Sequence, residues 1–303
     1  MTRVIMGDMF QGKFWQFIRI IRPRFLLLTT LVYVLGVVIA QYLGYRINWA
    51  IFFWGLIWVF NVQMCGFFLH EYGISLESQS HNPSKDNDEK FSQLWLQIAF
   101  VLTASIAGMI TVGLMRWGIV GLPEGIMMLI VFGGMLLVSI PSVGLMDKGY
   151  GELVISVLVS NFIPALAFLL QTSDLHKLLL LVTFPLTFMF LAMLIVMEFR
   201  SYASDIKKGR VTLLVCIGWE RGVLLHNILI LTAYLVIGLA ALLGVSKRVI
   251  LMGMLTFPMG LFQIWYLLKI ADGIKPAWKF FVDNSMLLYG MLVSILAFQF
   301  WIY

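Results

Sequence analysis

Charged residues are scarce in this chain of 303 residues. Asp, Glu, Lys and Arg together account for 12% of it, whereas 61% of the residues are hydrophobic. Soluble globular domains contain about 25% charged and about 45–50% apolar residues. The composition therefore excludes an ordinary soluble domain and predicts a protein that crosses the membrane several times.

Cysteine is scarcer still, and the alternation of polar and apolar side chains that a membrane β-barrel needs is absent. The two cysteines, Cys65 and Cys216, lie in or beside apolar runs, where they are interpreted as small buried hydrophobic residues. Neither a disulfide framework nor a cysteine-based metal site is expected. Because the apolar runs are too long and too uniform for barrel strands, helices are expected to span the membrane.

Long apolar runs are abundant, and a run of about 20 residues can cross the hydrocarbon core as a helix. The first run has no small-residue cleavage site and is expected to be retained as a helix. Residues 1–22, with apolar residues at helical spacing among basic ones, are predicted to lie in the interface as a helix. The predicted fold class is all-α, a polytopic membrane protein with residues 1–303 as a single domain. Nine spans are predicted, near residues 25–43, 48–69, 95–115, 119–142, 153–171, 178–197, 223–244, 249–268 and 282–302.

Basic residues are unevenly divided between the two sets of connecting segments. If the N-terminus is cytoplasmic, 16 of the 21 Lys and Arg residues fall on the cytoplasmic side. Such an excess predicts an integral membrane protein with a cytoplasmic N-terminus and a C-terminus on the outer side. The membrane topology explains the excess of Lys and Arg over Asp and Glu, and no nucleic-acid partner is expected. The five basic residues on the outer side are Arg46, Arg116, Lys177, Lys247 and Arg248.

One charged stretch, residues 197–218, interrupts this apolar pattern at the end of the sixth predicted span. Charge is costly near hydrocarbon, so a charged cluster in such a place indicates a functional site. Asp205 and Glu198 are its acids, and they lie seven residues apart, on one face of an ideal helix within about 20°. Its basic residues are Arg200, Lys207, Lys208 and Arg210.

The stretch resembles the second signature of the UbiA superfamily of intramembrane prenyltransferases, in the form found in 1,4-dihydroxy-2-naphthoate prenyltransferases. That form reads roughly N-N-x-R-D-x-x-x-D-R-x-x-G-K-x-T-L-x-V-x-x-G. Ser201 stands where the first aspartate is expected. The matching positions are Arg200, Asp205, Gly209, Thr212, Leu213, Val215 and Gly218.

Three further segments support the resemblance. The end of the second span occupies the place of the family's first signature, N-D-x-x-D-x-x-x-D. Tyr72 and Gly73 match the naphthoate branch there, and His70 and Glu71 replace the asparagine and the first aspartate. Ile74 and Ser78 replace the other two aspartates. The naphthoate branch also shows a G-x-G-[ED] opening to a helix, like residues 149–152, and the family usually has an R-P-x-T-like entry to its first span, like Arg22-Pro23.

The resemblance implies an all-α bundle around a central cavity and the transfer of a polyprenyl group from its diphosphate to an aromatic quinone-type precursor. It implies that Asp205, Glu71 and Glu198 would hold Mg²⁺ and serve catalysis. Glu77 would join them only if the helix had ended before it, because six residues correspond to a rotation of about 240° on a helix. The residues implied in substrate binding are Arg200, Lys207, Arg210, Lys148, Arg22 and Tyr72.

The replaced aspartates leave a second interpretation open. Residues 74, 78 and 201 cannot bind Mg²⁺ as anions. A bundle of this kind without a working metal site would be a catalytically degenerate relative. It would bind a lipid, a quinone or a pigment, or act as a structural subunit of a larger membrane complex.

Overall fold

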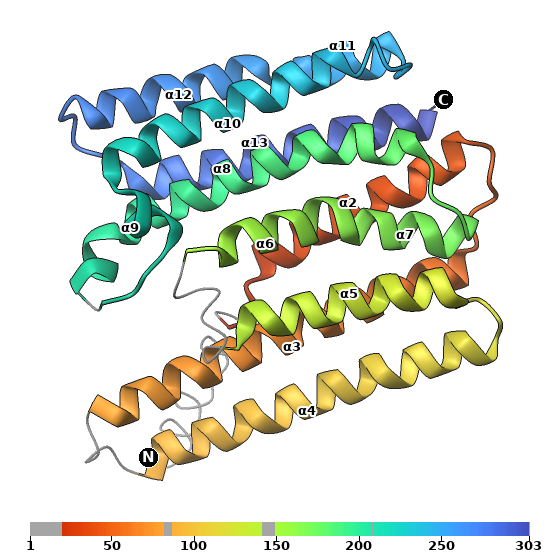
Figure 1. Ribbon diagram of the computed structural model, residues 1–303, viewed down its shortest axis with the longest axis horizontal. Helices are drawn as coiled ribbons and strands as arrows, with labels where there is room; N and C mark the ends of the chain where they lie inside the picture. Colours follow the sequence, from red (N-terminus) through yellow and green to blue (C-terminus); the bar gives the residue numbers. More distant parts are fainter. Residues whose placement is uncertain (1–19, 82–86, 141–148, 208, 303) are drawn as a thin grey trace, which may run out of the picture.

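The computed structural model describes residues 20–81, 87–140, 149–207 and 209–302, which contain helices and no strand. Nine of the described helical segments are long and apolar enough to cross a membrane, which confirms the predicted number. The segments run antiparallel to one another, and the ends of successive helices alternate between the two ends of the bundle (Figure 1). The helices are α2 (Pro23–Tyr42), α3 (Trp49–His81), α4 (Asn87–Arg116), α5 (Leu122–Ser139), α6 (Gly151–Val157), η2 (Leu158–Phe162), α7 (Ile163–Thr172), α8 (Lys177–Lys207), α9 (Leu213–Ile217), α10 (Trp219–Leu239), α11 (Lys247–Met254), α12 (Phe257–Ala271) and α13 (Trp278–Ile302).

Helices α2, α7, α8 and α13 form the middle of the bundle. Helix α2 packs on α7 and on α13, and α13 also packs on α8. On one side, α3 packs against α4 and α5. On the other, α10 packs against α8 and α12. Figure 1 shows this order, with α3, α4 and α5 on one side of the central helices and α10, α11 and α12 on the other.

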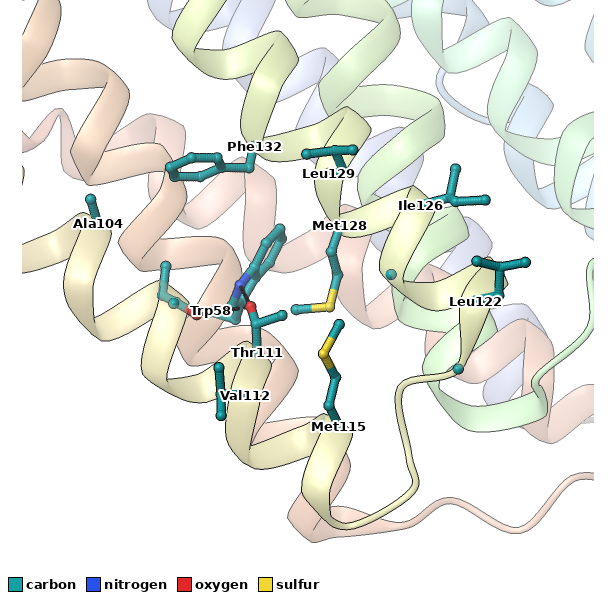
Figure 2. A pocket seen from close by; sticks show the side chains of 14 residues that line it. Trp58, Ala104, Thr111, Val112, Met115, Leu122, Ile126, Met128, Leu129 and Phe132 are labelled. Atoms are coloured by element: carbon teal, nitrogen blue, oxygen red, sulfur yellow. Dashed lines mark hydrogen bonds between the residues drawn. The ribbon is translucent and has the colours of Figure 1, made fainter.

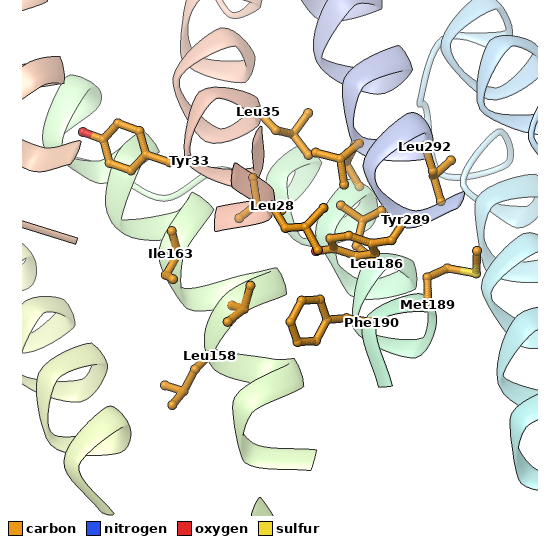
Figure 3. Close-up of a cluster of buried hydrophobic side chains, with 14 of the residues drawn as sticks. Leu28, Tyr33, Leu35, Leu158, Ile163, Leu186, Met189, Phe190, Tyr289 and Leu292 are labelled. Atoms are coloured by element: carbon orange, nitrogen blue, oxygen red, sulfur yellow. The ribbon is translucent and has the colours of Figure 1, made fainter. Parts of the chain in front are cut away.

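A continuous apolar core joins the central helices (Figure 3). Leu35 of α2, Leu186 of α8 and Leu292 of α13 are each fully buried within it. Helices α2 and α7 approach each other closely at Gly36. A Cβ atom at Gly36 would lie 2.1 Å from the carbonyl oxygen of Pro164, so only glycine fits there. Small residues allow membrane helices to approach this closely.

Polar side chains tie the fifth span to its neighbours. The span changes from α-helix to one π-helical turn, η2, and back. Thr183 donates a hydrogen bond of 2.9 Å to the Asn161 side chain, which in turn donates to Thr187. The Ser160 and Tyr289 hydroxyls are 3.0 Å apart. Buried polar groups in lipid need such partners.

Two helices continue past the boundaries predicted for their spans. Helix α3 extends to His81 instead of ending near residue 69, and α8 extends to Lys207 instead of ending near residue 197. Both charged signatures therefore lie on helices. Because α3 has not ended at Glu77, the condition for grouping Glu77 with Glu71 is not met. The predicted eighth span is two helices, α11 and α12, separated at residues 255 and 256. The predicted interfacial helix at residues 1–22 lies almost wholly outside the described residues.

Candidate functional site

The predicted site residues gather at one end of the bundle, which we call the site end. Helix α2 begins there, α3 and α8 end there, and α6 begins there, on the left in Figure 1. Helix α9 and the chain around it fold against the same end. Segments that are more than 100 residues apart in the sequence thus meet around the two signatures.

Arg22 links the start of α2 to the end of α3. Its backbone adopts a left-handed conformation, with φ 48° and ψ 62°, and its carbonyl accepts a hydrogen bond of 2.8 Å from the Phe25 N–H. The guanidinium carbon lies 5.5 Å from the centre of the Phe67 ring. Burial lowers the pKa of Arg22, and the negative charge of Glu71 opposes that decrease. The structure therefore places Arg22 beside the first signature.

His70 lies in the same neighbourhood. The positive charges of both Arg22 and Arg210 act on its half-buried imidazole. Arg210 follows α8, so the segment after the second signature reaches the end of α3. We call Arg22, His70 and Arg210 the basic cluster. Tyr72, predicted to bind substrate, has its hydroxyl 2.6 Å from the Gln97 amide nitrogen of α4, which donates to it.

Asp205 is buried on α8, with 6% of its surface exposed. The Ser201 hydroxyl donates a hydrogen bond to Asp205 Oδ2. Ser201, which stands in place of the first aspartate of the signature, therefore engages one carboxylate oxygen of the second aspartate, Asp205. Gly209, at φ 65°, turns the chain after α8 in a conformation that favours glycine, and the Arg210 N–H bonds to the Asp205 carbonyl at 2.9 Å.

Glu198 ties the segment after α8 back onto that helix. Its Oε2 accepts a hydrogen bond of 2.7 Å from the Leu214 N–H at the start of α9. Thr212 caps α9, and its hydroxyl accepts from the Val215 N–H at 3.4 Å. Glu198 Oε1 is buried, and no donor group from the part of the chain that the structure describes reaches it. One oxygen of Glu198 is therefore structural, and the other is available.

Glu152 is an acid of the site that was not among the predicted ligands. It lies in the first turn of α6, and its carboxyl meets that of Glu198. The turn before it packs on α9, since a Cβ atom at Gly149 would lie 3.0 Å from the Leu213 Cα. Its place in the G-x-G-[ED] segment was a signal for its importance, but no sequence spacing pairs α6 with α8.

The remaining predicted residues lie at the edge of the site. Arg200 and Lys207 are exposed on α8. Lys148 lies outside the described residues. Among the described residues, no group of three or more His, Cys, Asp or Glu side chains converges as a metal site. Glu71, Glu198 and Asp205 thus do not form a ready-made set of three ligands. The acids that are present still fit Mg²⁺ through one or two carboxylates completed by phosphate oxygens and water.

Two apolar grooves run along the outside of the bundle. One, of about 650 Å³, lies between α3, α4 and α5 near the end opposite the site (Figure 2). Trp58 donates a hydrogen bond of 2.9 Å to Thr111 in its floor. The other, of about 680 Å³, runs between α2 and α13 and starts at Pro23 and Arg24, directly after Arg22.

Comparisons with known proteins agree with this architecture. The profile of the UbiA prenyltransferase family matches residues 93–291. One similar solved structure is a UbiA homologue from Archaeoglobus fulgidus bound to GPP and Mg²⁺, with a TM-score of 0.58 and 13% identity, covering 94% of this chain and 99% of that one. Another comes from a study of a digeranylgeranylglyceryl phosphate synthase in membranes, with a TM-score of 0.56 and 14% identity, covering 96% and 98% of the two chains. At these identities the likeness concerns the fold. No curated protein matches the chain.

Proposed function

Because this chain belongs to the UbiA prenyltransferase family, we propose that it transfers a polyprenyl group from a diphosphate donor to an aromatic quinone-type precursor, as the naphthoate branch does. The observation that carries the proposal is the convergence of Arg22, His70 and Arg210 with acids of both signatures at one end of an integral, multi-pass bundle. A polyprenyl diphosphate carries several negative charges at one end of a long apolar chain. The bundle likewise has these charged groups at one end, apart from its apolar core.

The basic cluster would hold the donor's diphosphate. Arg22 and Arg210 keep their charge at any physiological pH, and guanidinium groups bind phosphate oxygens in pairs. Arg200 and Lys207 add exposed positive charge nearby. In this proposal Lys148 also contributes to substrate binding.

Asp205, Glu71 and Glu198 are the proposed Mg²⁺ ligands and catalytic acids. When bound, Mg²⁺ would neutralise the leaving diphosphate as the allylic C–O bond breaks. Asp205 is held in place by Ser201, and Glu198 by Leu214. The work of these side chains is therefore to keep negative charge fixed at the site end.

The groove between α2 and α13 would take the isoprenoid tail. It is lined mainly by leucine and methionine, among them Leu27, Leu31 and Met286. Arg24 and Asp283 form an ion pair at its entrance on the site end. Since the groove starts next to Arg22, a donor with its diphosphate at the basic cluster would continue into it.

The orientation and extent of the domain follow the same proposal. The site end carries most of the basic residues and would face the cytoplasm, which places the N-terminus inside and the C-terminus outside. Residues 1–303 would form one domain. Membrane lipids would be in contact with the outer helices.

A second candidate function is binding without catalysis. This candidate is favoured by Ser201, which stands where the family has a second carboxylate. Its hydroxyl donates a hydrogen bond to Asp205. Such a protein would hold a quinone, a pigment or another lipid, alone or as a subunit of a larger membrane complex.

Product formation separates the two candidates. The purified protein in nanodiscs would receive Mg²⁺, polyprenyl diphosphates of several lengths and 1,4-dihydroxy-2-naphthoate or related aromatic acceptors. We expect a prenylated product with at least one pair, and its loss in Asp205→Asn. The control is Arg116→Gln, at the opposite end of the bundle, which should keep full activity. Donor binding without any product would support the second candidate.

A further inference from the structure

A pair of buried carboxylates, Glu152 and Glu198, lies between α6 and α8 at the site end. Each residue has 8% of its surface exposed. The two carboxyl groups interact directly. Glu152 Oε2 and Glu198 Oε1 are both buried, and among the described residues no donor group outside the pair reaches either oxygen. Two oxygens without such a donor thus belong to acids that face each other.

The surrounding structure holds this pair in place. The Leu214 N–H bonds to Glu198 Oε2 at 2.7 Å, which fixes that carboxylate with its other oxygen unused. The Ser156 hydroxyl donates to the Glu152 carbonyl at 2.6 Å within α6. Both acids lie on helices that pack against each other, so the backbone holds the two residues close together before any ligand arrives.

Two adjacent buried carboxylates are stabilised either by a shared proton or by a positive partner. Burying an unpaired charge is costly, and two like charges side by side increase the cost. No Lys or Arg among the described residues forms an ion pair with either acid. The unused oxygens are hard ligands of the kind that Mg²⁺ prefers, and Mg²⁺ is typically bound by one or two carboxylates with water and phosphate completing its shell.

We propose that Glu152 and Glu198 together bind one divalent cation of the Mg²⁺ type. Glu198, Ser201 and Asp205 lie within about 60° of one another on α8. The pair would therefore supply carboxylates near the face of α8 on which Ser201 stands in place of an aspartate. The role of this cation in prenyl transfer rests on the proposed function, but its binding does not.

The test is titration of Mn²⁺, a paramagnetic substitute for Mg²⁺, into the full-length protein in nanodiscs without donor, followed by electron paramagnetic resonance. We expect a bound ion in the wild type and at least tenfold weaker binding in Glu152→Gln and in Glu198→Gln. Glutamine keeps an oxygen that accepts from the Leu214 N–H. The control is Glu220→Gln, an exposed acid in the first turn of α10, which should bind Mn²⁺ like the wild type.

A second measurement guards against misfolding. The melting temperature of the wild type should rise with Mn²⁺, and this rise should be lost in Glu152→Gln even though that variant melts cooperatively without metal. Unchanged Mn²⁺ affinity in both variants, or no binding by the wild type, would overturn the proposal and leave a carboxyl pair that shares a proton. Product formation with unaltered Mn²⁺ binding in Glu152→Gln would refute this inference alone. Metal binding without any product would refute only the proposed function.

Discussion

The ends of α3 and α8 carry the two segments that resemble the family's signatures, and the two segments differ in their charged residues. On α3, Ile74 and Ser78 have replaced acids, and the remaining His70 and Glu71 lie beside Arg22. On α8, Asp205 remains, bonded to Ser201, and Glu198 is bonded to Leu214 and meets Glu152. The α3 side combines Arg22 with one acid, Glu71, and the α8 side holds the buried acids. The comparison teaches that a site built from two helix ends can contain both positive and negative groups and still divide them unequally between α3 and α8.

The largest effect is expected from removing the positive charges near α3. Arg22→Gln and Arg210→Gln should each weaken the binding of a polyprenyl diphosphate analogue on the order of 10- to 100-fold, because a hydrogen bond to a charged group contributes about 1.5–3 kcal/mol. The double variant should lose measurable binding. Equilibrium binding in nanodiscs would measure this, with Arg116→Gln at the opposite end as the control. Single variants with unchanged affinity would show that the basic cluster does not hold the diphosphate.

A smaller effect, in the opposite direction, is expected from restoring the acid on α8. Ser201→Asp should lower the Mg²⁺ concentration needed for donor binding by about tenfold, since the number of carboxylate ligands tunes the affinity for a hard cation. The matched control is Ser204→Asp, which adds the same charge at an exposed position of the same helix. An equal response of both variants would mean that general charge, and not a ligand position, causes the change.

The smallest effect is expected at Tyr72. Its hydroxyl is bonded to Gln97 of α4, so it is engaged outside the basic cluster. Tyr72→Phe should change donor affinity by less than about twofold and reduce stability by about 0.6 kcal/mol, a typical value for a polar contact between membrane helices. Donor binding and thermal unfolding of the same preparation would check both values. A tenfold loss of affinity would instead place the hydroxyl on the substrate.

The nine spans were predictable because each is a long apolar run, and the lipid environment allows few other structures for such runs. The ends of α3 and α8 were not predictable from hydropathy, because a helix does not stop where its side chains become polar. The π-helical turn at residues 158–162 and the break between α11 and α12 also leave no mark in an apolar pattern. In both cases the backbone changes while the side chains remain hydrophobic.

The site was predictable where it depends on local spacing and not where it depends on packing. Asp205 and Ser201 are four residues apart on one helix, so their contact follows from helical geometry. The resemblance to the family suggested that Arg22 and Arg210 share one site, but it gave His70 no role there. The contact between Glu152 and Glu198 joins separate helices, and it became visible only when α6 and α8 were placed side by side.

The central claim is that the site end binds a polyprenyl diphosphate through Mg²⁺ and the acid retained on α8. The most direct test measures binding of a non-hydrolysable polyprenyl diphosphate to the purified protein, with and without Mg²⁺, beside the Asp205→Ala variant. It needs no assumption about the acceptor. The account predicts binding that requires Mg²⁺ and disappears in the variant. Binding that is indifferent both to Mg²⁺ and to Asp205 would contradict it and would leave a lipid-binding or structural member of the family.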